Sequence, residues 1–154
     1  MKQIVIYDMD GCLVNSLHRY RVVAETQKID LQYWLDNEHK AMLDELLPLA
    51  EQYQAQLLDD DIYVIIATAR VLNAPDWEFI NDVLGLPDKV ISRNGRADDR
   101  RGADLKIEGL RFLKNLKQFK DVEKHFYEDN VEYLKPVCDF LNCNGSYIPS
   151  KQGH

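Results

Sequence analysis

Residues 3–11 read Gln-Ile-Val-Ile-Tyr-Asp-Met-Asp-Gly, a short apolar run followed at once by two acids and a glycine. The run Gln3–Tyr7 is β-branched and has no polar alternation, which is typical of a strand buried on both faces of a parallel sheet. Asp8 and Asp10 would then lie at the carboxyl end of that strand. Gly11 would allow the chain to turn tightly directly after them.

Further strands and helices alternate along the rest of the chain. We predict strands at residues 61–67, 89–92 and 125–127, and an edge strand at 146–148. Helices are predicted at residues 17–58, 75–84, 105–119 and 131–141, with a polar loop at 93–104. This alternation indicates an α/β fold, a Rossmann-like three-layer sandwich with a central parallel sheet and right-handed crossovers. We expect one domain over residues 1–154, with a small helical insert at about 17–58 and no large cap.

Composition excludes several classes of protein. The chain has 154 residues, of which 45% are hydrophobic, enough for one globular core. No apolar run approaches the roughly 18 residues of a membrane span, and the run after Met1 is too short for a signal peptide. Cys12, Cys138 and Cys143 are an odd number at non-motif spacing, which favours a reducing compartment. We therefore expect a cytoplasmic protein without a membrane partner.

Charge bears on the partners of the chain. The net charge of −7 argues against bulk attraction to nucleic acid. The acidic excess lies before residue 91, whereas the remainder is slightly basic. A local anion-binding face in the second half is therefore compatible with the composition, and a solvated helix surface is the alternative.

Polar side chains gather where the predicted strands end. Because ligands bind beyond the carboxyl ends of parallel strands, we expect these residues to form one site: Asp8, Asp10, Thr68, Arg70, Glu128, Asp129 and Asn130. Clustered carboxylates repel one another unless a cation neutralises them or a proton is shared. No His or Cys near the strand ends suits zinc, and Cys12 is interpreted as a small packed residue, so oxygen donors favour Mg²⁺.

Carboxylates beside magnesium are suited to phosphoryl transfer. Such a group can attack phosphorus and carry the phosphoryl group as an acyl phosphate. Asp8 ends the strand and would point at the substrate. Asp10, in the following turn, would reach the leaving oxygen as a general acid.

Four segments resemble the motifs of the haloacid dehalogenase superfamily of phosphohydrolases. Asp8–Ser16 strongly resembles the first motif and Ile65–Arg70 the second. Lys106 can serve as the third, and Tyr127–Asn130 is similar to the fourth. The motifs occur in the right order at the right element ends, so the joint match is much more specific than any single one.

The resemblance implies a role for each matching residue. Asp8 would be the nucleophile, and Asp10 first the acid and then the base that activates water. Thr68 would donate a hydrogen bond to a phosphoryl oxygen. Lys106 would balance the charge of Asp8 and the phosphate, with Lys114 and Lys117 as nearby alternatives.

A magnesium site is implied by the same resemblance. Its ligands would be Asp8, the main-chain carbonyl of Asp10, and Asp129 with help from Glu128. The presence of Asp10 favours hydrolysis over dehalogenation.

A narrower resemblance concerns the substrate. Residues 90–106 resemble the stretch before the third motif in the phosphatase domain of polynucleotide kinase–phosphatases, which remove a 3′-phosphate from nucleic-acid ends. Four arginines there could grip a neighbouring backbone phosphate: Arg93, Arg96, Arg100 and Arg101. We take Arg70, Arg93 and Arg100 as the substrate-binding candidates. The alternative is that Arg100 and Arg101 pair with acids of their own loop, Asp98, Asp99 and Asp104.

The predicted function is thus a magnesium-dependent phosphatase acting on phosphorylated nucleic-acid ends or nucleotides. The chain has no Gly-x-x-x-x-Gly-Lys-Ser/Thr loop, so kinase activity by that route is excluded. A small-metabolite phosphatase of the same superfamily is one alternative. A non-catalytic phosphate-binding module is another, disfavoured because such a module has no need for the mutual repulsion of Asp8 and Asp10.

Overall fold

Five parallel strands form the central sheet of the computed structural model, which describes residues 1–19, 21–26 and 28–150. Every neighbouring pair in this sheet is parallel, as the alternation of elements predicted. The strands follow one another across the sheet as β7 (Lys89–Arg93), β6 (Ile62–Val71), β1 (Gln3–Tyr7), β8 (Glu123–Glu128) and β9 (Asn144–Tyr147).

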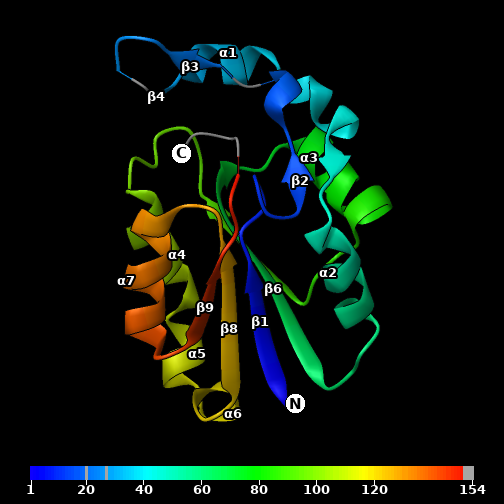
Figure 1. Cartoon of the computed structure of the whole chain (residues 1–154), viewed down its shortest axis with the longest axis vertical. Helices are drawn as coiled ribbons and strands as arrows, with labels where there is room; N and C mark the ends of the chain where they lie inside the picture. Colours follow the sequence, from blue (N-terminus) through cyan, green and yellow to red (C-terminus); the bar gives the residue numbers. More distant parts are fainter. Residues whose placement is uncertain (20, 27, 151–154) are drawn as a thin grey trace.

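Helices cover the sheet from both sides (Figure 1). On one side lie α4 (Gly102–Leu110), α5 (Phe112–Asn115), α6 (Lys117–Lys120) and α7 (Val131–Leu141); on the other lie α2 (Leu49–Leu57), α3 (Ala74–Phe79) and η3 (Ile80–Leu84). Successive residues of β1 point to opposite faces. Ile4 and Ile6 therefore join the first hydrophobic cluster, whereas Val5 and Tyr7 join the second. The predicted three-layer α/β architecture is confirmed.

The order of the strands places β1 at the centre. From β1 the chain builds β6 and β7 on one side and then crosses back to build β8 and β9 on the other. Tyr7 is level with Ile66 of β6 and Tyr127 of β8, so β1 and β8 end at nearly the same height, whereas β6 continues to Val71. Ligand sites in open α/β sheets form at this reversal of strand order. The acids after β1 and β8 are thereby brought together.

Residues 17–58 are helical only in part, which corrects the prediction of a helical insert. They contain η1 (Leu17–Arg19), β3 (Val22–Val23), β4 (Lys28–Ile29), α1 (Leu31–Asp36), η2 (Glu38–Leu43), β5 (Glu45–Leu46) and α2. β3 and β4 pair with each other, and β5 pairs with β2 (Val14–Asn15). The Asp30 side chain accepts a hydrogen bond from the Tyr33 amide, so α1 begins only there.

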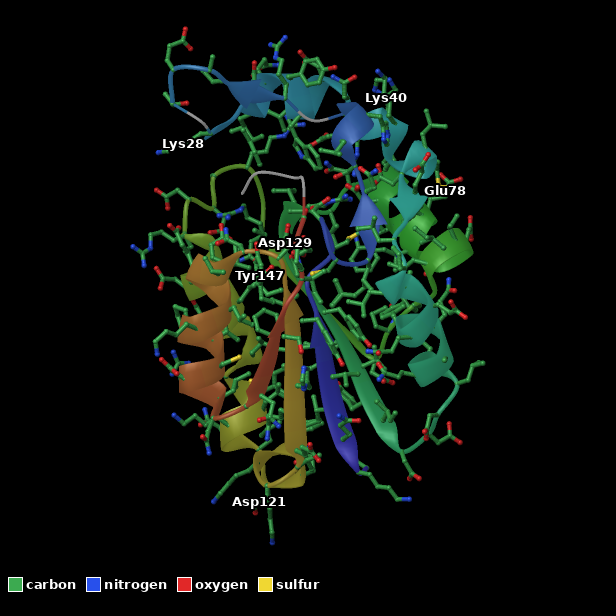
Figure 2. The ribbon with its side chains drawn as sticks, in the orientation of Figure 1. Lys28, Lys40, Glu78, Asp121, Asp129 and Tyr147 are labelled. Atoms are coloured by element: carbon green, nitrogen blue, oxygen red, sulfur yellow. The ribbon has the colours of Figure 1, made fainter. Side chains whose placement is uncertain are left out.

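The segment before α2 extends over the carboxyl end of the sheet (Figure 1). We call residues 17–47 the overhang. In Figure 2, Lys28 of the overhang and Asp129 lie toward the same end of the molecule, and Asp121 lies at the opposite end. The overhang is small, and residues 1–19, 21–26 and 28–150 contain no large cap, as expected.

The predicted helix over 105–119 is broken into α4, α5 and α6. Leu116 adopts an extended backbone and precedes α6. The ring of Phe119 is thereby buried against Phe112 and Tyr63. The Lys124 ammonium donates to three carbonyls at and just after the end of α6, those of Phe119, Lys120 and Val122. Burial of the Phe119 ring and capping of the three carbonyls by Lys124 are together more favourable than an unbroken helix over residues 105–119.

Other element boundaries agree closely with expectation. The helix predicted at 131–141 is α7, and the one at 75–84 is α3 continued by η3, ending at Gly85 with a φ of +104°. Strand β6 runs beyond the predicted end to Val71, with an irregularity in its pairing after Ala67. Such an irregularity redirects side chains at a strand end. No helix in the described part of the chain is long and apolar enough to cross a membrane.

Leu110, at the end of α4, tests how strongly the helical layer holds the sheet. Its side chain is fully buried in the first hydrophobic cluster, so Leu110→Ala should lower the free energy of unfolding by about 2–5 kcal/mol. The matched control is Leu58→Ala, because Leu58 is 87% exposed and its loss should change that energy by less than about 0.5 kcal/mol. Urea denaturation measures both; equal losses would contradict the assignment of the core.

Candidate active site

Lys106 and Asp8 form a buried ion pair at the carboxyl end of the sheet. Asp8 is the first residue after β1, and Lys106 lies on α4 with no exposed surface. The Lys106 Nζ lies 2.9 Å from Asp8 Oδ1 and 2.6 Å from Glu128 Oε1. The two alternatives considered for this lysine, Lys114 and Lys117, are both exposed. The structure therefore brings Lys106 to the predicted nucleophile.

Burial dominates the protonation of this pair. Removal from water, together with the neighbouring Glu128, raises the pKa of Asp8 well above its ordinary value, and Lys106 offsets only part of this. Burial also disfavours the charged ammonium, but Asp8 and Glu128 outweigh it and raise the pKa of Lys106. The lysine is therefore a permanent cation between two carboxyl groups. The cluster still carries an excess of acidic groups once Asp129 is counted.

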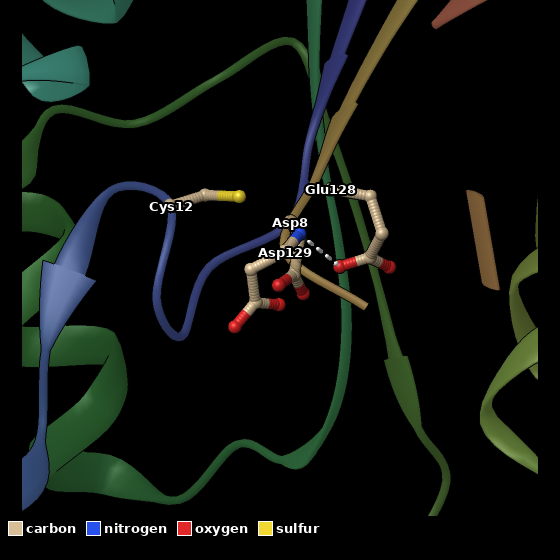
Figure 3. Close-up of side chains that lie close together, drawn as sticks. All are labelled: Asp8, Cys12, Glu128 and Asp129. Atoms are coloured by element: carbon tan, nitrogen blue, oxygen red, sulfur yellow. Dashed lines mark hydrogen bonds between the residues drawn. The ribbon is translucent and has the colours of Figure 1, made fainter. Parts of the chain in front are cut away.

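Asp8, Glu128 and Asp129 form an acidic cluster (Figure 3). One potential ligand atom from each, together with the Cys12 sulfur, lies within 4.8 Å of the others. Glu128 Oε2 accepts a hydrogen bond of 3.0 Å from the Asp129 amide, which orients the neighbouring acid. The second oxygen of Asp8, Oδ2, is buried and has no hydrogen-bond partner among the described residues. A buried carboxylate oxygen without a donor fits a site for a cation.

The presence of Cys12 in this group corrects the expectation that no cysteine lies near the strand ends. Burial and the nearby carboxylates raise the pKa of the Cys12 thiol far above its ordinary value. Asp8, Glu128 and Asp129 contribute carboxylate oxygens to the same group, and such hard oxygen donors suit Mg²⁺.

Gly11 allows the acids to approach one another. Its φ is +81°, a conformation that residues with a side chain rarely adopt. A β-carbon at this position would collide with Asp129 Oδ2 and with the hydroxyl oxygen of Ser150. Ser150 was not foreseen from the sequence, because it lies far from any motif and reaches the site through the segment after β9.

Asp10 is held by two donors. Arg70 at the end of β6 forms a bidentate pair with it, Nε to Oδ2 at 2.7 Å and Nη2 to Oδ1 at 2.5 Å. Ser16 donates to Oδ1 at 2.7 Å. Arg70 is a substrate-binding candidate from its place after the second predicted strand. Its buried guanidinium contacts Asp10, the predicted acid–base residue, and its binding of substrate stays a prediction.

A second group of buried charges surrounds Arg70. Arg19 contacts Asp44 through Nε and Nη2, and its Nη2 lies 3.2 Å from Asp76 Oδ1. Arg70 contacts the same two acids at 3.1 and 2.9 Å. We call Arg19, Arg70, Asp10, Asp44 and Asp76 the arginine cluster. No sequence motif marks Arg19, Asp44 or Asp76, because only the fold brings their three segments together.

Thr68 lies in the last part of β6 and is buried. Its oxygen accepts a hydrogen bond of 3.1 Å from the Arg70 amide. The hydroxyl proton is then left for another acceptor, which is compatible with the predicted contact to a phosphoryl oxygen.

The arginines of residues 93–101 are occupied by the protein itself. Arg93 donates to the carbonyls of Ala69, Asp98 and Arg100 at 2.7–2.9 Å. Arg100 pairs with Asp98 at 2.6 Å and with Glu108 at 2.8 Å. Two exposed pairs complete the set, Arg96 with Glu38 at 3.4 Å and Arg101 with Asp104 at 3.5 Å. The observed contacts agree with the alternative prediction, in which Arg100 and Arg101 pair with acids and support the loop.

Replacement of Asp8 should stabilise the metal-free protein. Because burial disfavours ionised Asp8, Asp8→Asn should raise the free energy of unfolding at neutral pH in EDTA. A raised pKa stabilises the fold at low pH and costs stability as pH rises from the ordinary carboxyl pKa toward the raised one. The gain should therefore vanish below the ordinary Asp range. Urea denaturation at several pH values measures it.

Asp139→Asn is the matched control for this change, since its carboxylate is exposed and pairs with Lys135. It should leave stability nearly unchanged at all pH values. A loss of stability in Asp8→Asn at neutral pH would contradict the electrostatic description of the acidic cluster.

Comparison with solved structures supports the architecture. The chain matches the structure of a Pnkp1/Rnl/Hen1 complex with a TM-score of 0.69 and 21% identity, over 97% of this chain and 46% of that one. It also matches the HAD domain of effector protein Lem4 from Legionella pneumophila, with a TM-score of 0.57 and 13% identity, over 99% of this chain and 88% of that one. At these identities the likeness shows the fold alone, a HAD-like α/β fold.

Sequence comparison narrows the relationship. The 5′-deoxynucleotidase of Escherichia phage T5 is 29% identical over 84 residues, which are 52% of this chain and 34% of the relative. The chain thus matches about a third of the length of that protein. The family model described as bacteriophage T5 5′-deoxynucleotidase matches residues 1–94, from β1 to just beyond β7. On this match the chain belongs to the bacteriophage T5 5′-deoxynucleotidase family.

Proposed function

We propose that the chain is a magnesium-dependent phosphatase for nucleotides, contained in a single domain over residues 1–154. The observation that carries the proposal is the state of the Asp8 carboxylate. One oxygen is held by Lys106, and the other is buried beside Glu128 and Asp129, without a hydrogen-bond donor in the described part of the chain. Such an oxygen keeps a lone pair for phosphorus once a cation offsets the charge of the cluster.

Asp8, Glu128 and Asp129 fit the first coordination shell of Mg²⁺. The ion would offset the negative charge on the phosphate and on the three acids. Asp8 would form a bond to phosphorus as the ester bond breaks, giving an aspartyl phosphate. Lys106 would stay charged throughout, and Thr68 would donate its hydroxyl proton to a phosphoryl oxygen.

Asp10 would manage the proton in both halves of the reaction. In the first half it gives a proton to the leaving oxygen of the ester. In the second half it takes a proton from the water that attacks the aspartyl phosphate, so that inorganic phosphate leaves and Asp8 is restored. The bidentate contact with Arg70 holds the Asp10 carboxylate in one orientation for these transfers.

Two considerations favour nucleotides over polynucleotide ends. The matched family carries the name of a 5′-deoxynucleotidase. In addition, Arg93 and Arg100, proposed to hold a neighbouring backbone phosphate, are engaged with carbonyls and carboxylates of their own loop. A 5′-mononucleotide has no second backbone phosphate and needs no such grip. We therefore infer a deoxynucleoside 5′-monophosphate as the substrate.

A substrate panel tests this proposal. Purified protein with Mg²⁺ should release phosphate from deoxynucleoside 5′-monophosphates with a kcat/KM at least about tenfold above that for a sugar phosphate or a 3′-phosphorylated oligonucleotide. EDTA and Asp8→Asn should each abolish release. Preference for the oligonucleotide would favour the 3′-end reading, and preference for the sugar phosphate would favour a metabolite phosphatase. Undiminished turnover in Asp8→Asn would exclude Asp8 as the nucleophile.

Asp10→Asn should separate the two halves of the reaction. With 4-nitrophenyl phosphate the leaving group departs without a proton, so Asp8 can still be phosphorylated, but water lacks its base. We expect a burst of nitrophenol close to one equivalent of enzyme, followed by turnover at least about 100-fold slower than in the wild type. Rapid mixing measures both phases. Equal slowing of both would mean that Asp10 is structural.

A further inference from the structure

Asp44 joins the overhang to the arginine cluster. It follows η2, and its side chain is completely buried. Arg19, at the other end of the overhang, donates to Asp44 Oδ1 from Nε at 3.1 Å and to Oδ2 from Nη2 at 3.0 Å. This bidentate pair ties the beginning of the overhang to its end.

The same carboxylate reaches the predicted acid–base residue through one guanidinium. Asp44 Oδ2 accepts a hydrogen bond of 3.1 Å from Arg70 Nη2, and that nitrogen also lies 2.5 Å from Asp10 Oδ1. Arg70 Nη1 is held by Asp76 at 2.9 Å. Because the guanidinium is planar and rigid, fixing Nη1 and Nη2 fixes the edge that it presents to Asp10.

The surroundings allow these groups few other arrangements. The side chains of Arg19, Arg70, Asp44 and Asp76 are at most 3% exposed. The ring of Trp34, on α1 of the overhang, lies 4.3 Å from Arg19 Cζ and 5.2 Å from Arg70 Cζ. In such a dry setting each cation must keep its anionic partners. The position of Arg70 therefore depends on a residue that belongs to the overhang.

We propose that Asp44 is a positioning residue for the acid–base step. Held by Arg19, it sets the orientation of Arg70, and Arg70 in turn sets that of Asp10. The proposal rests on the proposed function, because it assumes that Asp10 protonates the leaving group. It assigns the overhang a part in the chemistry in addition to covering the end of the sheet.

The test compares two substrates of nearly equal shape. Phenyl phosphate needs a proton on its leaving oxygen, whereas 4-nitrophenyl phosphate does not. The ratio kcat/KM covers the steps up to departure of the leaving group, so hydrolysis of the aspartyl phosphate does not enter it. In Asp44→Asn we expect kcat/KM to fall at least about tenfold for phenyl phosphate and less than about threefold for 4-nitrophenyl phosphate.

Two further variants keep the result interpretable. Asp30→Asn is the matched control: Asp30 also lies in the overhang and pairs with an arginine, Arg21, at 2.5 Å, but it is not part of the arginine cluster. It should leave the ratio between the two substrates unchanged. Arg19→Gln/Asp44→Asn removes one charge of each sign, so the net charge of the cluster is preserved while Arg70 still loses Asp44. It should shift the ratio as Asp44→Asn does.

Several results would overturn the proposal. An equal fall for both aryl phosphates would make Asp44 structural, and unchanged values would show that Arg70 needs no help from it. A double variant that does not fold would mean that the fold itself requires Asp44. Wild-type protein that hydrolyses neither aryl phosphate nor any nucleotide with Mg²⁺ would remove the proposed function as well; wild-type activity with an unshifted ratio would remove only the role of Asp44.

Discussion

Three carboxyl groups at the end of a hydrophobic sheet need a cation or a shared proton among them, and the Lys106 ammonium lies between two of them. It joins α4 to both β1 and β8 by contacting Asp8 and Glu128. Complete burial strengthens this contact, and removal of the Lys106 charge would leave Asp8 and Glu128 without their ammonium partner. Because one lysine does not balance all three acids, the same arrangement leaves room for a divalent ion. The same excess of acids therefore explains both the structural role of Lys106 and the fit of the cluster to a metal ion.

Asp8 and Asp10 lie two residues apart and yet belong to different clusters. Asp8 faces Lys106 and the acids after β8, whereas Asp10 faces Arg70 and Ser16. The turn at Gly11 follows them directly, and any side chain there would displace Asp129. The bulged end of β6 supplies Arg70. Separate counter-ions allow two neighbouring carboxyl groups to have different chemistry.

Sequence reasoning reached the sheet and most of the acidic rim because both depend on short-range patterns. The apolar run before Asp8 and the acids after β8 sit at strand ends, and parallel strands end together. The partners of Arg70, Asp44 and Asp76, cannot be found from such short-range patterns. A lone arginine after a strand is equally compatible with substrate binding and with an internal ion pair, and only the tertiary structure brings Asp44 and Asp76 to it. The prediction of a helix over residues 17–58 is wrong. Asp30 caps α1, and the helix-favouring composition of the segment does not reveal that boundary.

The contacts of Asp8 and Asp10 also bear on the predicted roles of these two residues, without reference to any motif. A nucleophile needs an oxygen with an available lone pair, and Asp8 Oδ2 has no hydrogen-bond donor among the described residues. Both oxygens of Asp10 accept hydrogen bonds from Arg70, and Oδ1 accepts another from Ser16. The Asp10 carboxylate is therefore held in one orientation, and its engaged oxygens are less available for attack on phosphorus. These contacts agree with the order of roles that the resemblance implies, nucleophile first and acid–base residue second, which stays a prediction.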